Sequence, residues 1–148
     1  MALSSKLDFE KAVFMKIRKT FPKKEEGAVA EVVMFDGHIV VYKFIQGLSF
    51  FVTGGEEENE LILESVLEGF SEAVACVLPS KKLNKKTALE NLDLIFLCLD
   101  EVTDEGIVLE TDAKVIAEKV LGHVEGDEQT LNGLLTTARD HITRSLLN

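Results

Sequence analysis

One change of hydrophobic period, near the middle of the chain, constrains the fold more than any other feature. Residues 38–53 form two runs rich in Val, Ile, Tyr and Phe, separated by Gln46-Gly47, which is typical of two strands joined by a turn. Gly54-Gly55 then interrupts the pattern, and from Asn59 the apolar residues follow helical spacing. These helical positions are Leu63, Val66, Leu67, Phe70, Val74, Val77 and Leu78. A hairpin therefore leads into an amphipathic helix that must bury one face, most simply against the sheet.

A further strand is predicted before this pair, at residues 31–35. Asp36-Gly37 follows it directly, and this dipeptide favours a type I′ hairpin turn because Gly tolerates a positive φ. The expected strands are 31–35, 38–45 and 48–53. Both alternating sets of residues 38–45 contain apolar side chains. We therefore expect both faces of the sheet to be covered, either by this chain or by another subunit.

Helices are predicted both before and after the strands in the sequence. The first would be capped by Ser4 or Ser5 and end at Pro22, with a surface loop at 22–30. Residues 79–86 are predicted to be a solvated basic loop, the alternative being a small anion or partner patch. The remaining predictions are a helix from Thr87 to Thr103 stopped by Gly106, an extended segment at 107–110, a helix capped by Thr111 or Asp112, a loop at 122–126 and a last helix from about Asp127. Because the strands cluster in sequence, the fold class is α+β, in one domain spanning residues 1–148.

Composition narrows the classes of function. The net charge is −10 over 148 residues, which argues against nucleic acid and disfavours direct adhesion to anionic lipid. Cys76 and Cys98 lie in apolar helical patterns and are predicted to be buried, reduced thiols. No apolar signal-peptide region and no membrane-spanning run is visible in the sequence. We therefore expect a soluble, intracellular protein whose contact with membranes is made through a partner.

No pattern typical of a catalytic or ligand site is found. His38, His123 and His141 are scattered, without the spacing that zinc needs. The Asp-Glu pairs at 100–101 and 104–105 are interpreted as solvated helix ends. The glutamates at 60, 64, 68 and 72 are interpreted as a wet helix face, although a basic partner surface is an alternative. We assign no catalytic, cofactor-binding or metal-binding residue, and partner-binding residues stay unassigned.

Several motifs together resemble a known family. They are IVVYKF at 39–44, FFVTGGEEENELIL at 50–63, ALENLDLIFLCLDEVTDEGIVLETD at 88–112 and TARDHITRSLL at 137–147. The chain is similar over about residues 7–147 to the zeta subunits of coatomer, of the plant type, within the family of adaptor and coatomer small subunits. The shared runs include NEL at 59–61, LDE at 99–101 and LET at 109–111.

The resemblance implies a longin-like α+β domain without catalytic function or cofactor. Such a subunit pairs with the coatomer gamma subunit in a cytoplasmic coat, peripheral on Golgi membranes and vesicles. An Arf-family GTPase recruits that coat, which carries traffic between Golgi and endoplasmic reticulum and within the Golgi. Family members also have a hairpin before the first helix, giving five strands. Without it, Leu48, Phe50 and Val52 would line an unpaired edge, so we expect a shortened form that is less stable alone or borrows a strand.

Two other functions remain open at the level of sequence. An adaptor sigma-like subunit that recognises cargo sorting peptides would need an apolar pocket with a basic rim, which the acidic 60–72 segment disfavours. A small enzyme would need clustered His, Cys or carboxylate side chains in a deep pocket. The scattered histidines disfavour the enzyme.

Overall fold

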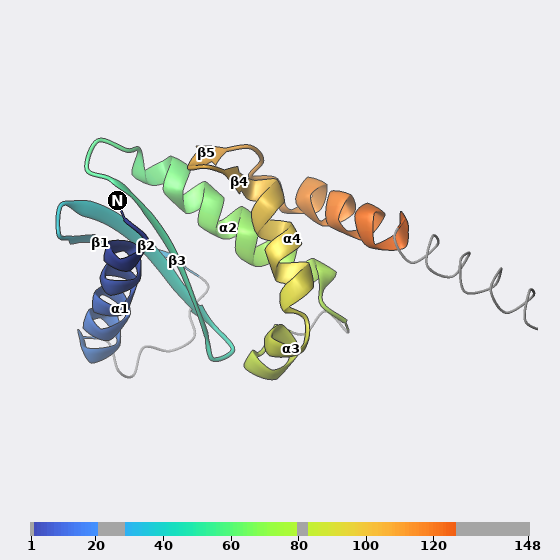
Figure 1. The fold of residues 1–148 in the computed structure, drawn as a ribbon, viewed down its shortest axis with the longest axis horizontal. Helices are drawn as coiled ribbons and strands as arrows, with labels where there is room; N and C mark the ends of the chain where they lie inside the picture. The colour runs from blue at the N-terminus through green and yellow to red at the C-terminus, as the bar shows by residue number, and fades with distance from the viewer. Residues whose placement is uncertain (1, 21–28, 80–82, 127–148) are drawn as a thin grey trace, which may run out of the picture. The chain divides into compact units, whose positions relative to one another are not determined.

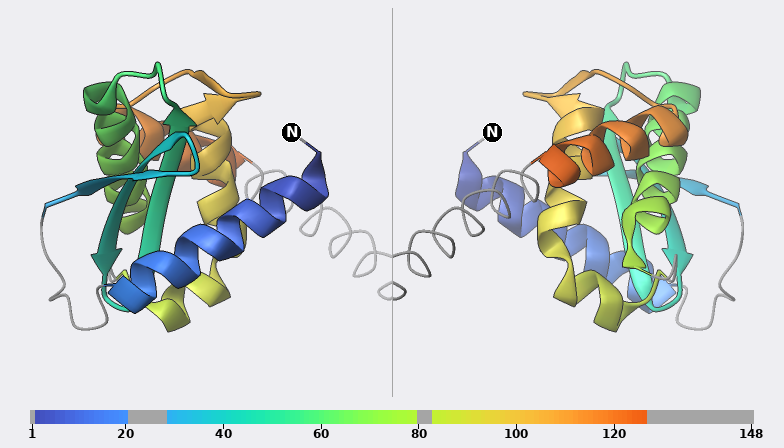
Figure 2. Two further views of the ribbon diagram at one scale, coloured as in Figure 1. Left: turned by 90° about the vertical axis from the view of Figure 1, so that its left-hand side faces the viewer. Right: turned by 90° about the vertical axis from the view of Figure 1, so that its right-hand side faces the viewer.

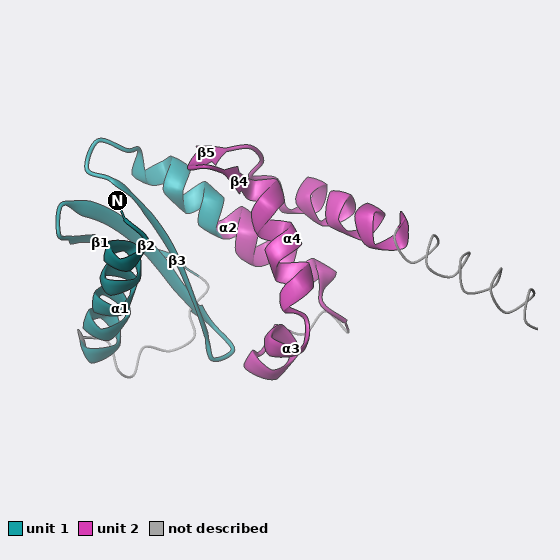
Figure 3. Ribbon diagram, viewed as in Figure 1, with its two compact units in different colours: residues 1–67 teal, residues 68–148 magenta. Residues whose placement is uncertain are grey.

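The computed structural model describes residues 2–20, 29–79 and 83–126 (Figure 1). The chain divides into two compact units, residues 1–67 and 68–148 (Figure 3). Each unit combines helices with antiparallel strands, which confirms the α+β class. Their union in a single domain stays a prediction.

The first unit contains helix α1 (Leu3–Thr20) and a three-stranded antiparallel sheet. Its strands are β1 (Glu31–Phe35), β2 (His38–Ile45) and β3 (Leu48–Gly55), in the order β1-β2-β3. Both connections are two-residue turns with positive φ, 48° and 70° at Asp36-Gly37 and 48° and 79° at Gln46-Gly47. These angles are those of type I′ turns, so both predicted hairpins are confirmed.

One face of the sheet is covered by α1. Val13 and Ile17 of α1 form a buried cluster with Val40 and Tyr42 of β2, and Phe9 is among the partly buried residues packed against it. The predicted cap at Ser4 or Ser5 is wrong, because α1 begins at Leu3 and the Lys6 amide already donates to the Ala2 carbonyl. The helix ends at Thr20; Pro22 and most of the predicted 22–30 loop lie outside the described residues.

The opposite face of the sheet is also buried, as the apolar character of both sides of β2 predicted. Ile39 and Val41 are almost inaccessible to solvent. At the paired position on β3, a Cβ added to Gly54 would meet the Leu63 side chain at 2.8 Å. Gly54 and Gly55 are therefore not a break, as the sequence suggested, but the end of β3. The absent side chain of Gly54 lets the next helix approach the strand.

Helix α2 (Glu60–Val77) begins in the first unit and continues into the second. Asn59 starts it, because its side-chain oxygen accepts a hydrogen bond from the Leu61 amide at 2.9 Å. The apolar face predicted from period 3.6 is confirmed, since Leu63, Val66, Leu67, Val74 and Val77 are all buried.

The second unit places two helices where the sequence predicted one. They are α3 (Lys85–Glu90), which Asn84 caps, and α4 (Leu92–Val102). Asn91, with φ −131° and ψ 38°, separates them. The single helix from Thr87 to Thr103 is thus wrong, although its apolar period continues across the break.

A short hairpin follows α4. Its strands are β4 (Thr103–Asp104) and β5 (Ile107–Val108), joined by Glu105-Gly106 with φ 47° and 83°. Gly106 therefore supplies the turn between two strands. The prediction that it stops the preceding helix is wrong. The extended segment predicted at 107–110 begins with β5.

The chain is helical again over residues 113–126. Asp112 caps this helix as predicted, its Oδ1 accepting hydrogen bonds from the Lys114 and Val115 amides at 2.9 and 3.3 Å. The helix continues through Gly122, so the predicted loop at 122–126 is wrong. The predicted last helix from Asp127 lies outside the described residues.

The sheet of the first unit ends at β3 in the part of the chain that the structure describes. Phe50 is nevertheless buried, and Leu48 and Val52 are partly covered. The suggestion that this strand borrows another stays a prediction. Among the described helices, none combines the length and the apolar character needed to cross a bilayer.

Candidate functional site

The titratable side chains singled out in the sequence do not meet in one place. Within residues 2–20, 29–79 and 83–126, no three His, Cys, Asp or Glu side chains are arranged to hold a metal. His38 Nδ1 lies 2.8 Å from the Asp36 carbonyl oxygen of its own turn. His123 pairs with Glu101 in the second unit, and His141 lies outside the described residues. His38 and His123 thus lie in separate units of the chain and do not form a shared site.

The two cysteines differ in exposure. Cys98 is fully buried, and this burial, with smaller contributions from Cys76 and Glu101, raises its pKa from 9.0 to about 11. Such a thiol stays protonated at neutral pH and is a poor nucleophile. Cys76 is exposed, so the prediction that both cysteines are buried is wrong for this one.

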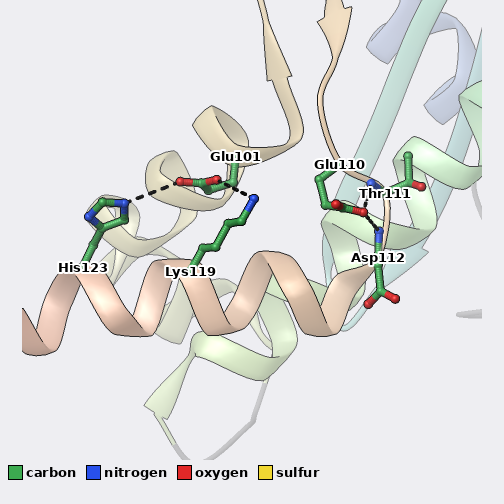
Figure 4. Close-up of polar contacts among 6 residues, drawn as sticks. All are labelled: Glu101, Glu110, Thr111, Asp112, Lys119 and His123. Atoms are coloured by element: carbon green, nitrogen blue, oxygen red, sulfur yellow. Dashed lines mark hydrogen bonds and ion pairs between the residues drawn. The ribbon is translucent and has the colours of Figure 1, made fainter.

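Glu101, the last residue of the LDE run, joins two helices of the second unit (Figure 4). Its carboxylate lies 3.9 Å from Lys119 Nζ and 3.6 Å from His123 Nε2, both on the helix over residues 113–126. The sequence suggested a solvated helix end here. Glu101 is instead partly buried and bridges α4 to the following helix.

Glu110, in the LET run, organises the segment before that helix (Figure 4). Its Oε1 accepts hydrogen bonds from the Thr111 and Asp112 amides at 3.1 and 3.0 Å. The Thr111 carbonyl then packs directly against Gly69 of α2, in the same unit. Glu110, Asn59 and Glu101 therefore each shape a helix end or a helix contact, which gives one residue of each of the NEL, LDE and LET runs a structural contact.

Large apolar side chains are exposed on several elements of the described chain. On α1 they are Leu3, Leu7, Phe14 and Met15; on β1, Val32 and Met34; on the start of α2, Leu61 and Ile62; and on α4, Leu92, Phe96 and Leu99. Exposed apolar patches of this kind mark protein–protein contacts. The glutamate stripe of α2 is only partly wet, because Glu64 and Glu68 are half-buried while Glu60 and Glu72 are exposed.

The sequence analysis left partner-binding residues unassigned, although a signal was present on α1. Its buried positions are Val13 and Ile17, four residues apart on one face. Leu3, Leu7 and Phe14 lie beside that face on the same helix. The breadth of the apolar surface of α1 is visible in the sequence, whereas its division into a buried and an exposed part depends on packing against the sheet.

Comparison with known proteins identifies the family. Residues 3–126 match the family described as clathrin adaptor complex small chain. Coatomer subunit zeta-1 of Oryza sativa subsp. japonica is 64% identical over 98% of this chain and 82% of its own length. Coatomer subunit zeta-2 of Arabidopsis thaliana is 57% identical (97% and 80%), and zeta-1 of Homo sapiens is 34% identical (94% and 75%).

A comparison of structures gives a more distant match. A chain in a homology model of the full-length AP-3 complex in a stretched open conformation covers 66% of this chain and 56% of its own length, at 22% identity and TM-score 0.48. The sequence matches extend over almost the whole chain. The chain therefore belongs to the clathrin adaptor complex small chain family and, within it, to the coatomer zeta subunits.

Proposed function

We propose that this protein is a non-catalytic small subunit of the coatomer vesicle coat and that it pairs with the coatomer gamma subunit. The observation that carries the proposal is identity of 55–64% to five plant coatomer zeta subunits over nearly the full chain. The coat would act in transport between Golgi and endoplasmic reticulum and within the Golgi. The protein would then be cytoplasmic and peripheral on Golgi membranes, held there through partners that an Arf-family GTPase recruits.

Two structural features support a binding function. The exposed apolar residues of α1, β1 and α4 provide surface suited to contact with another polypeptide. In the second unit, Glu101 and Glu110 make polar contacts with other residues of the same chain, and these contacts hold helix ends in place. A subunit that functions by assembly needs an exposed surface that can contact a partner and a stable fold that holds this surface in place.

The test is co-expression with a trunk fragment of coatomer gamma, followed by size-exclusion chromatography. We expect both chains to co-elute as a one-to-one complex. The matched control is the trunk of an adaptor large subunit of similar length, which should elute separately. Failure to co-elute with gamma, while the chain alone remains folded by circular dichroism, would refute the proposed pairing.

A further inference from the structure

We propose that the outward face of α1 is a docking surface for an acidic, amphipathic helix of a partner coat subunit. The inference rests on the proposed function and deepens it, because it names the surface and the chemistry of the partner. Four observations carry it: an exposed apolar stripe, the charge of the helix, the position of its cations and the acidic balance of the rest of the chain.

The apolar stripe consists of Leu3, Leu7 and Phe14, whose exposed fractions are 74, 48 and 39%. Their spacings of four and seven residues place them on one line along the helix. The line borders the packed face, where Val13 and Ile17 meet the sheet; at this border the Phe14 ring also lies 6.4 Å from the Phe51 ring of β3. In Figure 2, α1 lies along the outside of its unit, with one side turned away from the strands. A narrow exposed seam of this kind fits another helix better than a flat surface.

The charge of α1 is opposite to that of the whole protein. Its 18 residues contain five Lys and Arg and only Asp8 and Glu10 as acids, so the helix carries +3 while the chain carries −10. Two cations lie beside the stripe at helical spacing from it, Lys11 four residues after Leu7 and Arg18 four residues after Phe14. The Arg18 guanidinium is 5.5 Å from the centre of the Phe14 ring.

These features select the class of partner. In paired helices, charged residues beside an apolar seam choose partners of the opposite charge. The matching segment is therefore a helix with an apolar line bordered by Asp and Glu. An anionic bilayer fits less well, because the acidic remainder of the chain would be repelled by it and because Asp8 and Glu10 lie on the exposed part of the same helix.

The first test is lysine footprinting on the complex of this chain with the gamma trunk. Lys6, Lys11 and Lys19 are all exposed, so each can be acetylated in the free chain and read by mass spectrometry. We expect Lys11 acetylation to fall several-fold in the complex, while Lys114 and Lys119 of the second unit stay equally reactive. Unchanged acetylation of Lys6, Lys11 and Lys19 in a formed complex would overturn the proposal.

The second test compares two matched double variants. Leu3→Asp with Leu7→Asp places acids on the α1 stripe near a helix N-terminus, where they are compatible with the helix dipole. Ile107→Asp with Leu109→Asp makes the same change in the second unit, also at exposed positions. We expect the α1 variant to bind the gamma trunk at least about tenfold more weakly, and the Ile107/Leu109 variant to bind like wild type.

The outcomes separate the two proposals. Loss of binding by both variants, or by neither, would overturn the assignment to α1 while leaving the pairing intact. If wild type itself does not bind gamma, the proposed function fails first. A third arm uses vesicles of phosphatidylcholine with phosphatidylserine; binding by wild type that the α1 variant loses would assign the helix to lipid and overturn the acidic-helix partner.

Discussion

Gly69 offers a sharp test of the packing in the second unit. It lies in the middle of α2, where Ala is normally better than Gly by about 1 kcal/mol because Gly costs more backbone entropy. A Cβ built on Gly69, however, would overlap the Thr111 carbonyl oxygen and would stand 2.9 Å from its carbon. Since the obstructing atoms are backbone, no side-chain rotation can relieve the overlap.

The two effects have opposite signs, so their sizes decide the outcome. Overpacking of a close contact costs about 1–3 kcal/mol, and the upper part of this range applies because Thr111 is fixed on both sides. The Glu110 carboxylate holds its amide, and the following helix begins at once. We therefore expect Gly69→Ala to lower the free energy of unfolding by about 2 kcal/mol, after subtracting the gain in helix propensity.

The chain contains a matched control. Gly122 is also helical, and a Cβ added there would meet no atom within 4 Å. Gly122→Ala should therefore raise the free energy of unfolding by about 1 kcal/mol. Urea unfolding followed by circular dichroism measures both, and the slope m should not change. If Gly69→Ala stabilises the protein as Gly122→Ala does, the close approach of Thr111 to α2 is wrong.

Four further results are expected from the same unit. Asp112→Ala should cost about 1 kcal/mol in urea unfolding through the lost cap, whereas Asp112→Asn should cost little; equal losses would contradict capping. Glu110→Ala should cost about 1–2 kcal/mol because two amides lose their acceptor, and Glu110→Gln, which keeps an oxygen there, should restore most of it. Iodoacetamide at neutral pH should alkylate Cys76 and spare Cys98 in the native protein, as read by mass spectrometry. Because burial raises the Cys98 pKa to about 11, ionisation favours the unfolded chain above pH 9, so stability should fall between pH 9 and 11, less steeply in Cys98→Ala.

The features that sequence predicted correctly are local ones. Asp36-Gly37 needs only its own backbone preference to make a tight turn. Asp112 needs only a side-chain oxygen within reach of the next amides. The buried face of α2 follows from a period that any helix of this sequence would show.

The features that sequence missed depend on short elements or on distant neighbours. Asn91 interrupts a helix whose apolar period runs on unchanged from α3 to α4, so periodicity hides the break. Gly106 closes a hairpin whose strands have two residues each, too few to show alternation. Gly122 suggested a loop because Gly is a poor helix former, yet the surrounding residues keep it helical.

For the candidate site too, local sequence patterns were predictable and features that depend on packing were not. The absence of clustered catalytic side chains was visible in the sequence as an expectation, and the family could be inferred from the motifs. The exposed stripe on α1 was not identified, because Leu7, Val13, Phe14 and Ile17 lie on one broad apolar arc of the helix in the sequence pattern. Only the packing of Val13 and Ile17 against Val40 divides that face into a buried and an exposed part.

The order of elements in the first unit has a consequence for how the chain folds during synthesis. The sheet is made of two consecutive hairpins, each of which can close in about 1–10 μs. Ribosomes add roughly 5–20 residues per second, so the 18 residues of α2 take about a second or more to appear. Helix α1 is made before the strands, so Val13 and Ile17 are present when Val40 and Tyr42 emerge. The first apolar core can thus form on the nascent chain. Helix α1 then covers one face of the sheet before the chain is complete.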